Sequence, residues 1–136
     1  CALPIFRRSD VISAGDAFSF DTYPLIDRKR GGSIQGVLAA LNRMLDLAVP
    51  KDKQEGGTYI IPGHGRVCDE ADVVEYRDMV TIIRDRIADA IKRGLNLEMV
   101  KAAQLTMDYD GRFGTTSGSW TTDMFVEAVY RDLGGK

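Results

Sequence analysis

Apolar and polar residues are arranged in two ways along this chain, which predicts short strands followed by helices. Short apolar pieces occupy the first part, where residues 11–14 predict a buried strand and residues 17–20 a second β-like piece. A further strand is expected over residues 58–61, after a polar surface loop. Glycine, proline and aspartate separate these pieces, as expected where the backbone turns sharply.

Elsewhere the apolar residues recur every three or four positions, which is the spacing of one helix face. The predicted helices, each with the side chain expected to cap its start, are residues 34–49 (Ser33), 70–93 (Asp69), 97–103 (Asn96) and 123–133 (Thr121 or Thr122). The second helix, about 24 residues long, is expected to serve in packing, with a solvated charged face. Residues 109–114, together with the Gly/Ser/Thr stretch after them, are expected to form a mobile loop.

Charge and hydropathy restrict the classes of partner. The 136 residues carry 18 basic and 20 acidic side chains, mixed along the sequence, for a net charge of −2. This balance offers no broad basic face for nucleic acid. The one basic cluster, residues 28–30, is expected to be a solvated turn. No apolar run is long enough for a membrane-spanning helix, so no membrane partner is expected.

The two cysteines, Cys1 and Cys68, are too few for a disulfide framework and lack the spacing of metal ligands. The opening residues 1–4 read like the interior of a protein, which predicts that the chain is cut from a longer one. A mature lipoprotein also begins with cysteine, but the segment that follows here is apolar and not a polar tether. The sequence assigns no cellular compartment to the protein.

Two short motifs have chemical content, and each lies where a predicted strand ends. Asp16 follows a glycine after the first predicted strand, and the only histidine, His64, sits in Ile-Pro-Gly-His-Gly at residues 61–65. Aspartate after glycine is commonly a turn residue, whereas flanking glycines let the backbone at a histidine approach another group closely. Since carboxylate and imidazole are both zinc ligands, Asp16 and His64 are the candidate metal ligands.

These motifs, in this order and with the helix 33–49 between them, resemble the C-terminal half of the metallo-β-lactamase-fold hydrolases. Asp16 matches the bridging aspartate of that family, and His64 matches its last histidine. Residues 23–33, which run from Tyr-Pro-Leu-Ile-Asp to Gly-Gly-Ser, look like the segment that many members carry beside the active site. The resemblance covers roughly residues 10–95.

The resemblance implies an αββα sandwich with the active site at the strand ends, where Asp16 bridges two zinc ions and His64 binds the second. Such metals convert a shared water into a hydroxide that attacks a carbonyl or phosphoryl centre of a small molecule. The family's His-x-His-x-Asp-His motif is absent, because the chain has a single histidine. Since catalytic zinc needs at least three protein ligands, the chain alone is expected to bind metal weakly and to be inactive.

The expected fold class is therefore α/β, in detail a helix-rich α+β arrangement, with residues 1–95 as the C-terminal half of such a sandwich. Residues 96–136 would be a helical extension packed on it. Four side chains of this extension are candidates either for the substrate cleft or for packing: Tyr109, Arg112, Phe113 and Trp120. Packing is preferred, because aromatic residues in a glycine-rich loop more often plug a hydrophobic edge.

Loss of one sheet of the sandwich would expose Val11, Ile12, Tyr59 and Ile60 to water. At roughly 25 cal/mol per Å², an uncovered apolar face would cost on the order of 10 kcal/mol. We therefore expect the missing N-terminal half of the fold, or a second copy in a homodimer, to cover this face. A function of another class also stays open, a non-catalytic α/β interaction module whose Pro-Gly-His-Gly turn is structural.

Overall fold

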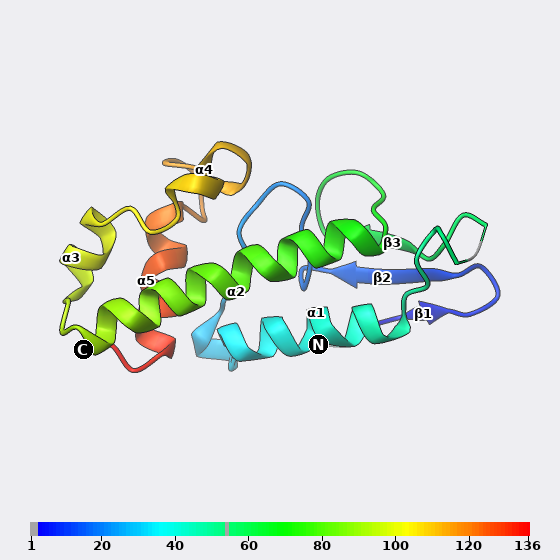
Figure 1. Ribbon diagram of the computed structural model, residues 1–136. Helices are drawn as coiled ribbons and strands as arrows, with labels where there is room; N and C mark the ends of the chain where they lie inside the picture. The colour runs from blue at the N-terminus through cyan, green and yellow to red at the C-terminus, as the bar shows by residue number, and fades with distance from the viewer. Residues whose placement is uncertain (1–2, 54) are drawn as a thin grey trace.

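The computed structural model describes residues 3–53 and 55–136, which form a small sheet and five α-helices (Figure 1). The elements in chain order are β1 (Ile5–Phe6), β2 (Val11–Gly15), the 3-10 helix η1 (Arg28–Arg30), α1 (Ile34–Leu47), β3 (Tyr59–Pro62), α2 (Glu70–Lys92), α3 (Leu97–Ala102), α4 (Met107–Phe113) and α5 (Thr122–Asp132). Strands lie in the first half and helices dominate the second, so the prediction of a helix-rich α+β fold is confirmed.

The sheet has the strand order β1-β2-β3 and is mixed. β1 pairs with β2 in the antiparallel sense, whereas β2 and β3 run parallel, with Ile12 opposite Ile60 and Gly15 opposite Pro62. α1 connects the two parallel strands, because parallel neighbours need a long crossover. Parallel strands end at the same edge of a sheet, so the residues that follow β2 and β3 emerge beside each other.

The predicted capping residues begin their helices as expected. Ser33 accepts a hydrogen bond from the first turn of α1. Asp69 and Asp72 accept from each other's backbone N–H groups and form a capping box at the start of α2. The side chains of Asn96 and Thr121 cap α3 and α5 in the same way as Ser33 caps α1.

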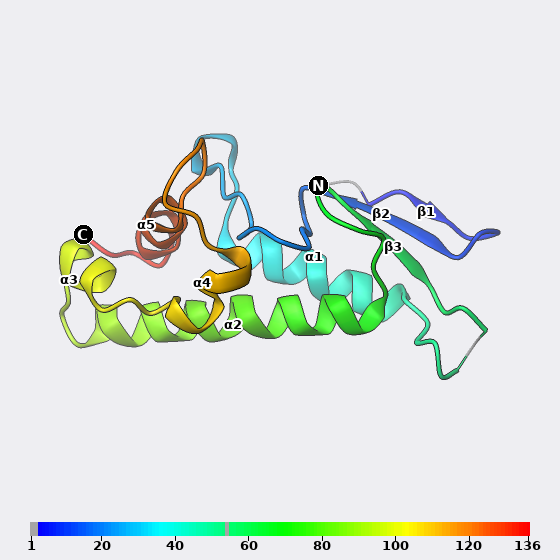
Figure 2. The ribbon, with the colours of Figure 1, turned by 90° about the horizontal axis from the view of Figure 1, so that it is seen from above.

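α1 and α2 lie side by side and cover one face of the sheet (Figure 2). Ile12 of β2 and Ile60 of β3 belong to this layer and are 1% and 0% exposed. α2 extends beyond the sheet, where it packs against α5 through residues such as Phe125 and Val129, which are fully buried. A single hydrophobic cluster therefore runs from the sheet to the last helix.

The predicted strand over residues 17–20 is wrong, because this segment is a turn. β2 ends at Gly15, whose φ is +50°, and the N–H groups of Ala17 and Phe18 bond back to the carbonyls of residues 14 and 15. Ala17 and Phe18 are nevertheless buried in the core. The apolar pattern thus correctly indicated burial and wrongly indicated strand pairing.

The predicted loop over residues 109–114 is also wrong, because residues up to Phe113 belong to α4. The Phe113 ring is 4% exposed and meets the Tyr76 ring edge-on, with 5.6 Å between the centroids. Burial of this ring offsets the cost of Gly111 within a helix, about 1 kcal/mol relative to alanine. Tertiary packing therefore overrides the weak local propensity.

The expected exposure of the sheet is half right. Tyr59 is 45% exposed, but Ile12 and Ile60 are buried under the helices, because successive side chains of a strand point to opposite faces. The other face is uncovered within the described part of the chain. Its apolar side chains define what we call the open face: Phe6, Val11, Tyr59, Ile61 and Val67.

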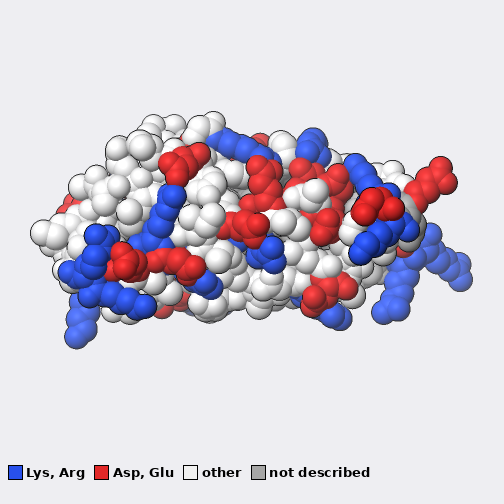
Figure 3. Space-filling view, viewed as in Figure 1, with Lys and Arg blue, Asp and Glu red and all other residues white. Residues whose placement is uncertain are grey.

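Charges of both signs are mixed along the exposed side of α2 (Figure 3). Ion pairs there include Arg77–Asp78 at 2.7 Å and Arg84–Asp85 at 2.6 Å, and such exposed pairs contribute little to stability. The basic residues of η1 are exposed as well. No helix among the described residues is both long and apolar enough to cross a membrane.

The two cysteines differ in what can be said of them. Cys68 is a free thiol, 2% exposed, next to the turn that carries His64. Burial raises the pKa of the Cys68 thiol to about 11. Cys1 lies outside the described residues.

Candidate functional site

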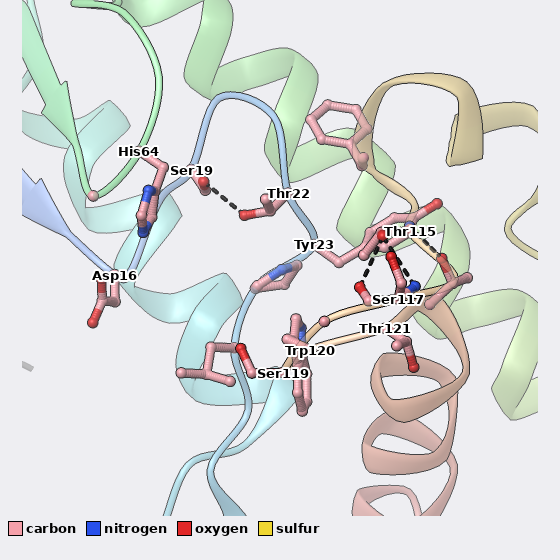
Figure 4. Close-up of a pocket in the computed structure, with 16 residues that line it drawn as sticks. Asp16, Ser19, Thr22, Tyr23, His64, Thr115, Ser117, Ser119, Trp120 and Thr121 are labelled. Atoms are coloured by element: carbon pink, nitrogen blue, oxygen red, sulfur yellow. Dashed lines mark hydrogen bonds between the residues drawn. The ribbon is translucent and has the colours of Figure 1, made fainter.

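Asp16 and His64 lie near each other at the carboxyl edge of the sheet, one after each of the parallel strands (Figure 4). Gly15 pairs with Pro62 after a shift in register between Ser13 and Gly15, and the chain leaves both strands at this point. The Asp16 carboxylate comes so close to the β3 turn that a Cβ atom on Gly63 would be 2.8 Å from its Oδ1. The sheet thus brings together the two residues that the sequence predicts as ligands.

The glycines on either side of His64 each have a structural reason. Gly63 packs against the Gly15 backbone and the Asp16 carboxylate, which leaves no space for a side chain. Gly65 has a φ of +99°, and a Cβ atom there would overlap Phe20. Both glycines allow the turn to approach the loop after β2.

Backbone hydrogen bonds attach this turn to the same loop. The Gly63 N–H donates to the Phe18 carbonyl at 3.0 Å, and the Phe20 N–H donates to the His64 carbonyl at 3.1 Å. These bonds fix the main chain that carries both candidate ligands relative to the sheet.

The Phe20 ring contacts two arginines from different parts of the chain. The guanidinium carbons of Arg66 and Arg112 each lie 4.3 Å from the ring centroid. Arg66 pairs with Asp72 at 2.7 Å, and Arg112 pairs with Glu75 at 2.9 Å. The start of α2 and the end of α4 therefore support the loop beside the candidate ligands.

Asp16 and His64 are free to bind an ion but do not complete a metal site. Both residues are exposed, and neither side chain makes a hydrogen bond or ion pair with another residue in the described part of the chain. One carboxylate and one imidazole suit zinc. Within residues 3–53 and 55–136, however, no three His, Cys, Asp or Glu side chains are grouped to hold a metal. A zinc site here needs at least one further ligand.

A cavity of about 620 Å³ opens beside these two side chains (Figure 4). Besides Asp16 and His64, its lining residues are Ser19, Thr22, Tyr23, Pro24, Leu25, Gly63, Phe113, Thr115, Ser117, Gly118, Ser119, Trp120, Thr121 and Thr122. Asp16 and His64 stand at one end of the cavity, and Thr115 and Ser117 at the other. Residues 23–25 belong to the segment that resembles an active-site neighbour.

The four side chains considered for the cleft divide into two pairs. Phe113 and Trp120 line the cavity. Tyr109 and Arg112 are not among the lining residues: Tyr109 lies under the Arg86 guanidinium, and Arg112 contacts Phe20 as described above. The segment after residue 96 therefore both packs on the rest of the chain and forms one wall of the cavity.

Tyr23 anchors that wall to the core. Its ring stacks on Phe125 with 4.6 Å between the centroids, and its hydroxyl donates to Asp110 Oδ1 at 2.7 Å. Burial, followed by the hydrogen bond to Asp110, raises the pKa of Tyr23 far above its ordinary value. The phenol is therefore a neutral structural group, fixed in position.

The hydroxyl groups of the cavity were missed by sequence reasoning. Ser19 and Thr22 lie in the segment that was predicted in part as a strand, and five more hydroxyl residues lie between positions 115 and 122. The available signal was the density of Ser, Thr and Gly in that second stretch, and such a composition predicts a loop without indicating what the loop faces.

No family model matches this chain, and no curated protein matches it either. The geometry of the site is thus the basis on which a function can be assigned.

Proposed function

We propose that this chain is the C-terminal half of a metal-dependent hydrolase of the metallo-β-lactamase superfamily, with an αββα sandwich fold. In this proposal Asp16 bridges two zinc ions and His64 binds one of them. One observation carries the proposal: both side chains sit at adjacent ends of two parallel strands, exposed and on the wall of the same cavity.

The number of candidate zinc ligands, two, is what one half of the proposed metal site would supply. Bound zinc would supply a hydroxide nucleophile at neutral pH. The contribution of this chain is to hold the Asp16 carboxylate and the His64 imidazole on a sheet edge that backbone hydrogen bonds keep in place. Because two ligands are fewer than catalytic zinc requires, we expect the chain alone to be inactive.

The open face supports the same proposal from another part of the molecule. Phe6, Tyr59 and Ile61 are 54%, 45% and 44% exposed, so the sheet presents an apolar surface where a second sheet would pack. We propose that the remaining half of the fold covers it and brings the other metal ligands. A second copy of this chain in a homodimer is the alternative occupant.

The metal assignment is tested by zinc titration of the chain co-produced with the segment encoded upstream of it. Asp16→Ala and His64→Ala are each expected to lower the zinc stoichiometry or to weaken binding by about tenfold or more. Asp21→Ala is the matched control, because Asp21 is an exposed aspartate of the same loop that does not line the cavity. Equal stoichiometry and affinity in all variants would remove the assignment.

The parent sequence provides a second check. A His-x-His-x-Asp-His motif encoded upstream of Cys1 is the expected finding. Its absence would favour the non-catalytic interaction module, in which the open face binds a protein and the turn at His64 is structural.

A further inference from the structure

The cavity beside Asp16 and His64 has a lining that selects the chemistry of its ligand. We infer that the wall formed by Leu25 and residues 115–122 binds an uncharged small molecule with an apolar body and a carbonyl-type hydrogen-bond acceptor. This assignment rests on the proposed function in one respect, since it names the substrate class for the same site.

Charge is the first selective property of the lining. Among the described residues that line the cavity there is no lysine or arginine, and the ionisable groups are Asp16, His64 and the neutral phenol of Tyr23. A phosphate or carboxylate on the ligand body would therefore have no basic side chain of the wall as a partner. Moving an anion from water to such a surface is unfavourable, so the lining favours a neutral ligand over an anionic one.

Apolar surface is the second property. Leu25 is 54% exposed, borders the cavity and does not belong to the hydrophobic core cluster. Pro24, Phe113 and Trp120 line the same space. An aliphatic or aromatic ligand body would bury this surface, whereas a purely polar ligand would leave it in water.

Unpaired polar groups are the third property. The Trp120 Nε1 atom is buried and has no hydrogen-bond partner in the described part of the chain. The hydroxyls of Ser117 and Ser119 also have none among the described residues, whereas Thr121 caps α5 and Thr122 accepts from a backbone N–H. The Ser117 and Ser119 hydroxyls are exposed and can donate to a ligand carbonyl as they stand. A buried N–H without an acceptor is unfavourable, so a shift of the Trp120 indole toward a ligand carbonyl would also be favourable.

Trp120 is also the reporter for the test, because it is the only tryptophan in the chain. The probes are octanamide and octanoate, which have the same carbon chain and differ mainly in charge, with octyl phosphate as a third. Titrations followed by tryptophan fluorescence in metal-free buffer are expected to saturate for octanamide, with the two anions binding about tenfold more weakly or worse. Octanoate binding as tightly as octanamide, or no saturable change with octanamide, would overturn the inference.

Variants locate the binding surface. Leu25→Ala is expected to weaken octanamide binding about fivefold, because the removed side chain supplies exposed apolar surface of the wall. Met99→Ala is the matched control, since Met99 is 55% exposed and does not line the cavity. An unchanged affinity in Leu25→Ala would overturn the assignment to this wall.

The ligand class and the metal assignment fail in different measurements. If the zinc titration fails while octanamide still binds selectively, the metal site is wrong and the ligand class stands. If zinc binds as proposed and octanamide does not, only the ligand class is wrong.

Discussion

The two faces of the small sheet differ in how completely this chain covers them. On the closed face, Ile12 and Ile60 are 1% and 0% exposed beneath α1 and α2. On the open face, Tyr59 and Ile61 flank Ile60 in the same strand, β3, yet both are more than 40% exposed. β2 and β3 thus have a core side that α1 and α2 cover and an apolar side that the described residues leave uncovered.

This difference parallels the state of the candidate site. Hydrogen bonds hold the main chain around Asp16 and His64 in place. One wall of the nearby cavity is fixed to the core by Tyr23, whose hydroxyl donates to Asp110. The set of candidate ligands, in contrast, has two members, whereas catalytic zinc needs at least three protein ligands. The proposed missing half of the fold would explain both the uncovered sheet and the incomplete set of candidate ligands.

The largest expected effect is a difference between the two faces in how much a truncated side chain lowers the free energy of unfolding. Ile60→Ala should lower the free energy of unfolding by about 3 kcal/mol, because it creates a cavity under the helices. Ile61→Ala, one position along the same strand, should cost less than about 1 kcal/mol. Urea denaturation of both variants measures the difference. Similar losses would contradict the distinction between a closed and an open face.

The next prediction concerns self-association through the open face. We expect the chain without a partner to associate at micromolar concentrations, and Phe6→Lys/Ile61→Lys to weaken this association about tenfold or more. Met99→Lys/Met107→Lys is the control, since these apolar side chains on α3 and α4 are at least as exposed as Phe6 and Ile61. Sedimentation equilibrium measures both. A compact monomer of the unsubstituted chain would show that the open face needs no cover.

The smallest expected effect is a pH dependence of the free energy of unfolding, caused by the buried thiol of Cys68. The Cys68 pKa is about 11 in the folded chain against an ordinary value of 9.0, because burial disfavours the thiolate. The unfolded chain releases this proton first, so the stabilisation is complete below pH 9 and is lost as pH rises toward about 11. Denaturation at pH 8 and 10.5 should show a larger loss for the unsubstituted chain than for Cys68→Ala. An equal loss in both would contradict burial of the thiol.

Sequence reasoning located the helices well because their signals are local. Ser33, Asp69 and Asn96 cap the helices that they were predicted to cap, and each acts on the next few residues of the chain. Residues 17–20 and α4 were missed because distant contacts decide them. Burial of Phe113 stabilises α4 only because the rings of Tyr76 and Tyr23, which are distant in the sequence, pack against it.

The site was predictable in part for the same reason. Asp16 and His64 each follow a strand, and that position can be recognised from neighbouring residues. The role of Trp120 could not be recognised, because the loop after α4 reaches the cavity only through the packing of α5 against Tyr23. Whether the two candidate ligands bind zinc stays a prediction.

The most direct test of that prediction is an NMR titration of the isotopically labelled chain with Co²⁺. This ion binds to the same kinds of side chain as Zn²⁺, and because it is paramagnetic it broadens the signals of nearby nuclei. We predict that signals of residues 16 and 63–65 broaden first, and that Asp16→Ala and His64→Ala each abolish this selective broadening while Asp21→Ala preserves it. Broadening spread over the acidic surface, or selective broadening that survives loss of Asp16 or His64, would contradict a metal site shared by these two side chains.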